Sequence, residues 1–292
     1  MSAPRWAIEG RGWPNRAQSS FVTSGRMRWH VQSFGPADAP VLLLLHGTGA
    51  ATHSWRALAP LLAAQFRVVA VDLPGHGFTT GRPVDGLSMT AMARATGTLL
   101  QALKIAPTII VGHSAGAAIA IRMTLDGRAT PDAIVGLSAA LLPFPGLAAR
   151  LFPTLAKALF VNPFAPHLFT RMARVPGETA RFLQRSTGSR IDAEGARWYE
   201  MLFATSAHCA GAIGMMADWD LPALQRDLAR VQTRLLLVHG TADTAIPLSN
   251  AREAAAMIGG ARIETLAGLG HLAHEEQPEL VAGIIQGFAG ER

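Results

Sequence analysis

A serine framed by two glycines is the residue of this sequence best placed for nucleophilic chemistry. Ser114 stands in Gly112-His113-Ser114-Ala115-Gly116, between the apolar run 108–111 and the apolar run 117–121. A strand, such a Gly-x-Ser-x-Gly turn and a helix together raise the serine hydroxyl above the end of a sheet. The glycines permit a sharp turn that side chains would obstruct. The pattern therefore predicts that Ser114 is a nucleophile, with an ordinary serine-containing turn as the alternative.

A serine hydroxyl becomes a good nucleophile only when a base removes its proton. In this pattern the base follows the serine in the chain and lies in a loop after a strand. His271 follows the last strand-like run, 262–266, and the preceding Gly270 permits a tight turn towards Ser114. We therefore predict that His271 is the base. His274 is the alternative, and its structural interpretation is a contact with the neighbouring carboxylates.

The base in turn needs a carboxylate that orients its ring. Asp243 follows the apolar run 234–240, one strand before the run that leads to His271. The run 133–137 is followed by Ser138 and offers no carboxylate, which removes the usual alternative position. We predict that Asp243 is the acid. Its structural interpretation is the cap of a turn.

Backbone N–H groups near the serine can stabilise the negative oxygen that forms during acyl transfer. The Ala115 N–H lies at the start of the predicted helix. The second donor is expected in the glycine-rich loop after the apolar run 41–45, from the Thr48 N–H or alternatively from Gly49. Gly49 and His113 are the candidate substrate-binding residues, although packing beneath the loop is the favoured interpretation of His113.

The ten histidines raise the question of metal binding. No His, Cys or carboxylate grouping has the spacing of metal ligands, so we expect no metal. The run Gly47-Thr48-Gly49-Ala50-Ala51 lacks the third glycine and the later acid of a dinucleotide site. His46 and His76 lie in glycine turns and are predicted to hold loops by hydrogen bonds. The sequence therefore predicts no cofactor.

Composition narrows the function further. Hydrophobic residues make up 49% of the chain and the net charge is +6, without a basic block or basic–aromatic interleaving. These features predict a sizeable core and argue against nucleic-acid binding. Extra arginines in the region 150–197 suit an anionic ligand or a membrane surface, with a solvated face as the alternative.

Compartment is predicted from cysteine content and apolar runs. Cys209 is the only cysteine, so no intrachain disulfide can form, as is typical of a reducing compartment. Residues 1–15 hold no apolar stretch of the kind a secretory signal needs. The longest apolar runs are too short to span a membrane. We expect a soluble cytoplasmic protein that could lie peripherally at a membrane.

Strand-like and helix-like runs alternate along most of the chain. The expected strands are 21–23, 27–32, 41–45, 66–71, 108–111, 133–137, 234–240 and 262–266. The expected helices are 55–64, 87–103, about 117–125, 249–258 and 278–288. The first two strands form a hairpin after an irregular arm, 1–20, and the alternation predicts crossover connections in a parallel sheet. The expected class is α/β, with a mostly parallel eight-stranded sheet flanked by helices.

The alternation stops between residues 140 and 220, where prolines recur among helical-looking apolar segments. We interpret this region as a helical cap inserted between two parts of the core, 1–139 and 221–292. Its large apolar side chains are expected to divide between the core of the cap and a hydrophobic pocket above Ser114. They are Phe144, Phe152, Phe160, Phe164, Phe169, Trp198, Tyr199, Phe203, Met215, Met216 and Trp219.

The motifs assembled above resemble those of the α/β-hydrolase superfamily over nearly the whole chain. The matching segments are His46–Gly49, Asp72–Gly77, Gly112–Gly116, Gly240–Asp243 and Gly270–His271. This resemblance implies the α/β-hydrolase fold and a Ser–His–Asp triad.

A narrower resemblance is to the magnesium-chelatase accessory family of bacteriochlorophyll biosynthesis. It is carried by Trp13–Arg16, His46–Ala50 with Thr52–Trp55, Gly112–Ala118, Ala140–Phe144, Thr187–Arg190 and Gly214–Met216. The matches in the cap are the most telling, because caps vary most between subfamilies. The resemblance implies a cytoplasmic protein linked to magnesium insertion into protoporphyrin IX and in transient contact with magnesium chelatase. It leaves the reaction undefined.

Three functions remain open at this point. The first is a serine hydrolase acting on an ester, thioester or similar bond of an apolar small molecule, a tetrapyrrole among the candidates. The second is a non-catalytic accessory that holds a porphyrin, with cap arginines on its propionates, or contacts the chelatase. The third is an esterase or C–C bond hydrolase of unrelated catabolism. The complete set of Ser114, His271 and Asp243 favours catalysis.

Overall fold

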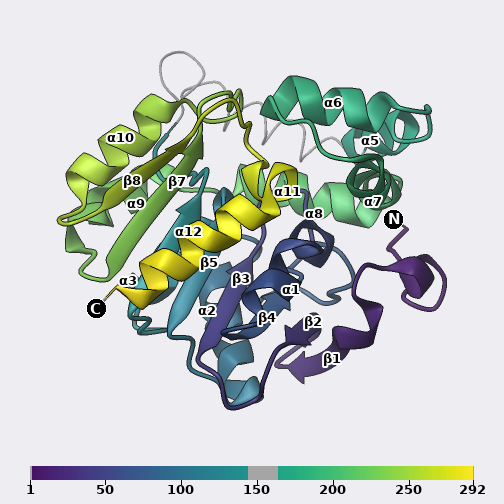
Figure 1. Ribbon diagram of the computed structural model, residues 1–292. Helices are drawn as coiled ribbons and strands as arrows, with labels where there is room; N and C mark the ends of the chain where they lie inside the picture. The colour runs from purple at the N-terminus through teal and green to yellow at the C-terminus, as the bar shows by residue number, and fades with distance from the viewer. Residues whose placement is uncertain (1, 144–163, 292) are drawn as a thin grey trace.

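A mostly parallel sheet of eight strands forms the centre of the protein (Figure 1). The computed structural model describes residues 2–143 and 164–291. The strands are β1 (Ser19–Ser24), β2 (Met27–Phe34), β3 (Val41–Leu45), β4 (Arg67–Val71), β5 (Ile109–His113), β6 (Ala133–Leu137), β7 (Arg234–Gly240) and β8 (Arg262–Leu266). Their order is β1-β2-β4-β3-β5-β6-β7-β8, antiparallel for β1 with β2 and β2 with β4, and parallel elsewhere. The predicted fold class is confirmed.

Helices cover both faces of this sheet. They are α1 (Leu58–Leu62), α2 (Met89–Leu103), α3 (Ala115–Leu125), α9 (Leu221–Asp227), α10 (Leu248–Met257), α11 (Ala273–Glu276) and α12 (Pro278–Gly290). Strand β3 explains why two covering layers are needed. Leu43 and Leu45 pack with residues of α2 and α3, whereas Leu42 and Leu44 pack with residues of α1 and α12. Because successive side chains of a strand point to opposite faces, a continuous apolar run must be covered on both.

The expected helix 55–64 begins later than predicted. The structure has a 3₁₀ turn, η3 (Thr52–Trp55), followed by the short helix α1. Pro60 explains the shift, because proline lacks an N–H and is tolerated only in the first turn of a helix. Starting at Leu58 places Pro60 in that turn.

The N-terminal arm is irregular for most of its length, as expected, but contains two short 3₁₀ turns. It forms the 3₁₀ turns η1 (Glu9–Gly12) and η2 (Arg16–Gln18), which lead into β1. Trp13 is buried, and its Nε1–H donates a hydrogen bond to Thr52 Oγ1 at 3.0 Å. Burial of this aromatic side chain holds an arm that has little helical or strand propensity of its own.

Between β6 and α9, the described residues form four helices that we call the cap helices: α5 (Ala165–Met172), α6 (Glu178–Thr187), α7 (Ala193–Phe203) and α8 (Ser206–Ala217). They gather beside one end of the sheet, at the upper right of Figure 1. A further 3₁₀ turn, η4 (Leu228–Arg230), precedes β7. The domain boundaries at 140 and 220 stay a prediction, and Phe144, Phe152 and Phe160 lie outside the described residues. In the described part of the chain, no helix combines the length and apolarity needed to cross a membrane.

Candidate active site

Ser114 occupies a strained turn between β5 and α3. Its φ is 50° and its ψ is −114°, a backbone conformation that L-residues rarely adopt. The flanking glycines are required sterically: a Cβ at Gly112 would collide with Ala117, and a Cβ at Gly116 would collide with the Leu45 carbonyl. The Ser114 N–H donates to the Leu137 carbonyl at 2.8 Å, which ties the turn to the neighbouring strand. The predicted turn geometry is therefore present.

The imidazole of His271 and the carboxylate of Asp243 form a close pair. His271 Nδ1 lies 2.8 Å from Asp243 Oδ2, and the other carboxylate oxygen accepts the N–H groups of Ala245 and Ile246 at 2.8 and 2.9 Å. Burial opposes ionisation of Asp243. The hydrogen bond and charge of His271 and the N–H of Ile246 outweigh it and lower the pKa of the carboxyl. An ionised Asp243 fixes the His271 tautomer that leaves Nε2 free to accept a proton.

Ser114 and His271 line the same cavity, together with Thr48, Gly49 and Ala115. In the described structure no hydrogen bond joins the Ser114 hydroxyl to His271. The Thr48 and Ala115 N–H groups also donate no hydrogen bond within the described residues, and the first N–H groups of a helix have no intrahelical acceptor. The cavity therefore brings together a hydroxyl, an imidazole and two backbone donors that are unpaired among the described residues, and their catalytic roles stay a prediction.

The cap holds the backbone of His271 in place. The His271 N–H donates to the Thr187 carbonyl at 2.9 Å, and the Leu272 N–H donates to Ser189 Oγ at 2.8 Å. These contacts come from the end of α6 and the residues after it. The sequence analysis singled out Thr187–Arg190 only for its resemblance and predicted no role for it, because nothing in the pattern shows which core loop it meets.

His113 lies between the elbow and the His271 loop. Its Nε2–H donates to the His271 carbonyl at 3.0 Å, and its ring lies 4.8 Å from the His271 ring. Burial, reinforced by the nearby His274 and His271, lowers the pKa of His113 well below its ordinary value, so the ring is neutral. His113 also lines the cavity. Its position therefore agrees in part with packing beneath the loop and in part with a contact to substrate.

His274 is buried away from Asp243. Its Nε2 lies 2.9 Å from Ser54 Oγ, so it contacts a hydroxyl rather than the carboxylates expected from its neighbours. Burial lowers the pKa of His274 to about 3. The adjacent Glu275 instead accepts from Ser54, Tyr199 and Arg56. His274 does not line the cavity and thus lacks the position of a base.

The cavity above Ser114 has a volume of about 510 Å³, in the range of small-molecule sites. Among the described residues no Asp, Glu, Lys or Arg lines it. Of the apolar residues predicted from sequence, five line the cavity: Phe169, Tyr199, Phe203, Met216 and Trp219. Trp198 and Met215 are buried in packed clusters, and Phe164 is exposed. The described wall of this cavity is mostly apolar.

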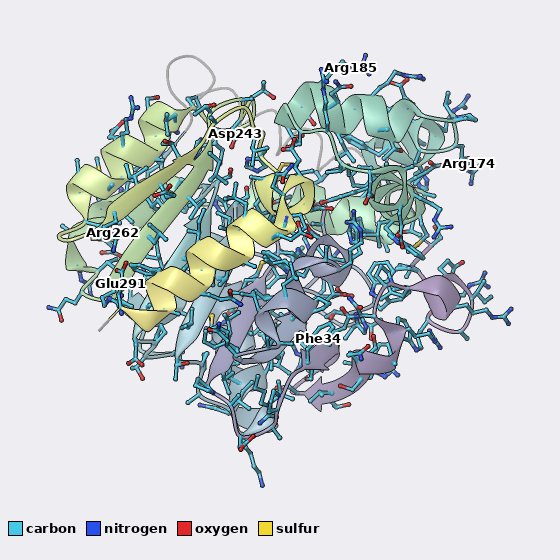
Figure 2. All side chains as sticks on the ribbon, viewed as in Figure 1. Phe34, Arg174, Arg185, Asp243, Arg262 and Glu291 are labelled. Carbon is cyan, nitrogen blue, oxygen red and sulfur yellow. The ribbon has the colours of Figure 1, made fainter. Side chains whose placement is uncertain are left out.

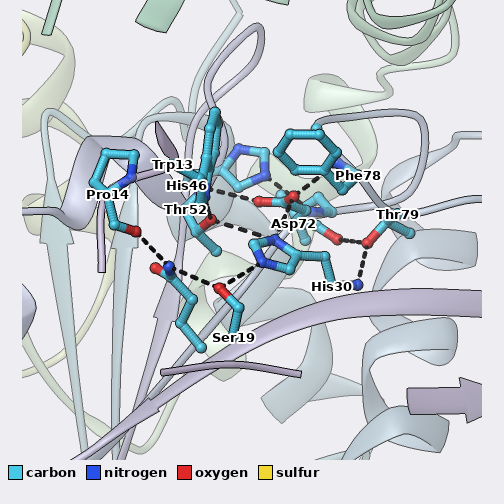
Figure 3. Close-up of polar contacts among 12 residues, drawn as sticks. Trp13, Pro14, Ser19, His30, His46, Thr52, Asp72, Phe78 and Thr79 are labelled. Atoms are coloured by element: carbon cyan, nitrogen blue, oxygen red, sulfur yellow. Dashed lines mark hydrogen bonds and ion pairs between the residues drawn. The ribbon is translucent and has the colours of Figure 1, made fainter. Parts of the chain in front are cut away.

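A second polar cluster supports the loop that carries Thr48 (Figure 3). Asp72 is fully buried and accepts hydrogen bonds from the Thr52 N–H at 2.7 Å and the Phe78 N–H at 2.8 Å. His30 Nδ1 lies 2.8 Å from the same carboxylate.

The two histidines predicted to hold loops belong to these surroundings. His46 Nε2 accepts the Leu73 N–H at 2.9 Å, in agreement with its predicted structural role. The predicted role of His76 agrees as well, since its Nδ1 lies 3.1 Å from the Pro74 carbonyl.

No cluster of three or more potential ligands suited to a metal ion occurs in residues 2–143 and 164–291. The buried histidines discussed above contact backbone, hydroxyl or single carboxylate groups instead.

The fold and this site define the class of protein. The model of the alpha/beta hydrolase family matches residues 42–284, and the chain belongs to that family. Two solved structures share the fold: an esterase from Exiguobacterium antarcticum (TM-score 0.76, 19% identity, 93% of this chain and 99% of that one) and a haloalkane dehalogenase loop variant from Bradyrhizobium elkanii (TM-score 0.73, 20% identity, 93% and 95%).

Two named proteins are similar to this chain in sequence over most of its length. The "Magnesium-chelatase 30 kDa subunit" of Rhodobacter capsulatus is 39% identical over 274 residues, which cover 94% of this chain and 95% of the relative. "Epoxide hydrolase 2" of Caenorhabditis elegans is 23% identical over 93% of this chain and 79% of its own length. The similarity to the chelatase subunit spans the core and the cap.

Proposed function

We propose that the protein is a serine hydrolase that cleaves an ester or related carbonyl bond of a neutral, apolar small molecule. The observation that carries this proposal is the His271–Asp243 pair at 2.8 Å, in a loop whose imidazole lines the same cavity as Ser114. A buried, ionised carboxylate behind an imidazole activates a serine hydroxyl when the imidazole can accept the hydroxyl proton, and here the imidazole and the hydroxyl line one cavity.

The proposed mechanism assigns one task to each group. On substrate binding the Ser114 hydroxyl gives its proton to His271 Nε2 and attacks the carbonyl carbon. The Ala115 and Thr48 N–H groups stabilise the resulting oxyanion. His271 then gives the proton to the leaving group, and water, activated by the same imidazole, hydrolyses the acyl-enzyme. Asp243 keeps the ring oriented and stabilises its charged form.

The cavity wall supports a neutral substrate. A carboxylate or ammonium group placed in an apolar cavity without a partner loses its hydration and is strongly disfavoured. The described wall provides no charged side chain that could compensate. The similarity to the Rhodobacter capsulatus protein supports a place beside the magnesium-chelation step of bacteriochlorophyll synthesis in the cytoplasm. An esterified tetrapyrrole is therefore the first substrate to test.

A second candidate is a non-catalytic tetrapyrrole-binding or chelatase-accessory protein, favoured by the name of the Rhodobacter capsulatus relative. Trp219 lines the cavity, so a bound porphyrin would quench tryptophan fluorescence. Saturable quenching in Ser114→Ala, together with full biological function of that variant, would favour binding over catalysis.

The experiment that tests catalysis is labelling of the purified protein by a fluorophosphonate probe, which reacts with activated serines. We expect labelling of the wild type, and its loss in Ser114→Ala and in His271→Ala. Ser19→Ala is the matched control, because Ser19 also lies beside a histidine, with its Oγ 3.0 Å from His30 Nε2, yet does not line the cavity. Absence of labelling in folded wild type, with the fluorophosphonate and with a smaller sulfonyl fluoride, would contradict the proposal.

A further inference from the structure

Helix α5 presents apolar side chains to solvent. Leu168 is 67% exposed, and Val175, just after the helix, is 50% exposed. Val175 lies in the turn that follows the helix, seven residues after Leu168. Large apolar side chains that are exposed close together in one short segment differ from the scattered single ones found on any surface, and they indicate an interaction.

Two arginines belong to the same exposed segment as these apolar side chains. Arg171 and Arg174 are exposed, lie between Leu168 and Val175 in sequence, and make no ion pair within the described part of the chain. Figure 2 shows Arg174 on the outer side of the cap, pointing away from the sheet. We call Leu168, Arg171, Arg174 and Val175 the basic cap face.

The neighbouring helix α6 adds to the positive charge of this side of the cap. Its exposed Arg181 and Arg185 bond to Glu178, the only acidic residue in 164–190, a segment with five arginines. Figure 2 shows Arg185 on the outer side of the cap as well. The net charge of this segment therefore stays positive although one carboxylate is present.

The opposite side of the same helices lines the active-site cavity. Phe169 of α5 and Phe182 of α6 both contact the cavity, and their ring centroids lie 6.2 Å apart. Leu168 outside and Phe169 inside are adjacent residues, so a single helix separates the surface from the cavity. The cavity, as described above, suits a neutral apolar compound, and such compounds collect in membranes.

We propose that the basic cap face docks on the surface of a membrane that contains anionic phospholipids. Guanidinium groups bind the phosphates, while Leu168 and Val175 enter the boundary between headgroups and acyl chains, as in interfacial amphipathic helices. An acidic protein surface would satisfy the arginines but leave the apolar side chains without a matching environment. A bilayer satisfies both and places the α5–α6 side of the cavity next to the source of its ligand.

The test is co-sedimentation of the full-length protein with vesicles of phosphatidylcholine, alone or mixed with phosphatidylglycerol. We expect binding only to the mixed vesicles, weakening as sodium chloride is raised because salt screens the charges. Each arginine near an anionic surface contributes about a fivefold gain in affinity. The double variant Arg171→Glu/Arg174→Glu is therefore expected to bind more than about 25-fold more weakly. The matched control Arg226→Glu/Arg252→Glu makes the same charge change at exposed arginines of α9 and α10 and should bind like the wild type.

The apolar contribution is tested by a second matched pair. Leu168→Ser is expected to weaken binding several-fold, whereas Leu280→Ser, at a leucine of α12 that is 49% exposed, should not. Circular dichroism confirms that each variant is folded. The proposal is overturned if the wild type does not bind the mixed vesicles at low salt. It is likewise overturned if the two arginine double variants lose vesicle affinity to the same extent. It is also overturned if wild type binds soluble polyglutamate as tightly as vesicles and Leu168→Ser changes neither, since that result indicates an acidic protein partner. None of these outcomes depends on the triad.

Discussion

The chain contains a Ser–His–Asp array at Ser19 as well as the one at Ser114, and the array with more complete hydrogen bonding is not the one that faces the cavity. Ser19 Oγ, His30 and Asp72 are joined at 3.0 and 2.8 Å. His271 and Asp243 are joined at 2.8 Å, without a hydrogen bond to Ser114 in the described structure. Both carboxylates also accept two backbone N–H groups. Hydrogen bonds alone would select the array of Ser19.

The surroundings separate the two arrays. His30 is fully buried, with the rings of Trp6 and Phe78 at 4.9 and 5.6 Å. Ser19 begins an ordinary strand, and its extended backbone, with φ −81°, offers no turn that aims its hydroxyl at a ligand. Its array therefore stabilises the packing of the hairpin and the Thr52 loop. The candidate active site is therefore defined by its access to a cavity and its unpaired backbone N–H groups. It is not defined by a full set of hydrogen bonds among serine, histidine and aspartate.

Replacing Asp243 with Asn tests the cavity-facing array and has the largest expected effect. The Asn amide N–H would favour the His271 tautomer with a protonated Nε2, which cannot accept the proton of Ser114. We expect kcat for an ester substrate to fall by about 10⁴-fold, with little change in the melting temperature. Steady-state kinetics and a thermal melt check both. An active Asp243→Asn variant would remove this array from the mechanism.

Replacing Asp72 with Asn should instead lower stability and have a smaller effect on kcat than Asp243→Asn. It removes the charge from a fully buried pair that also anchors the Thr52 and Phe78 N–H groups. We expect the free energy of unfolding to fall by about 3 kcal/mol or more. Urea denaturation measures it. A loss of kcat larger than that of Asp243→Asn, in a variant that remains folded, would reverse the roles assigned to the two arrays.

The pH dependence of stability sharpens this contrast at Asp72. Burial opposes ionisation of Asp72, but the charge and hydrogen bond of His30 lower its pKa far below the ordinary 3.8. A lowered folded-state pKa contributes stability that is present above the unfolded-state pKa and is lost as pH falls towards the folded-state pKa. The stability difference between wild type and Asp72→Asn should therefore shrink by about 1.4 kcal/mol per pH unit as the pH falls below the unfolded-state pKa. Denaturation at a series of acidic pH values measures it, and a difference that grows with acid would contradict it.

The smallest effect is expected at Ser19. Ser19→Ala removes the hydroxyl that contacts His30 Nε2 and accepts from Gln32 at 3.1 Å. The unfolding free energy should fall by about 1 kcal/mol, with kcat unchanged. Ser114→Ala should instead leave stability nearly unchanged and abolish activity. Equal stability losses in the two variants would show that the arrays do not differ as described.

Much of the candidate site follows from local sequence because local geometry determines it. The glycines around Ser114 and the glycine before His271 mark turns, and strand order in the chain indicates which loops converge. The array of Ser19 does not follow, because it depends on β2 pairing with β4 across the sheet. The sorting of cap residues between core and cavity likewise depends on how helices pack, which periodicity alone does not specify.

The hydrogen bonds that Thr187 and Ser189 accept from the His271 loop bear on how this protein could be redesigned or could have diverged. A cap that only covered a cavity could be replaced by another cap without changing the catalytic residues. Here replacement of the cap would remove the two hydrogen-bond acceptors, on Thr187 and Ser189, that fix the backbone of the proposed base. A chimaera that keeps the core and replaces α6 must therefore supply equivalent acceptors, and new substrate preferences are more accessible through side chains inside the cavity than through cap replacement.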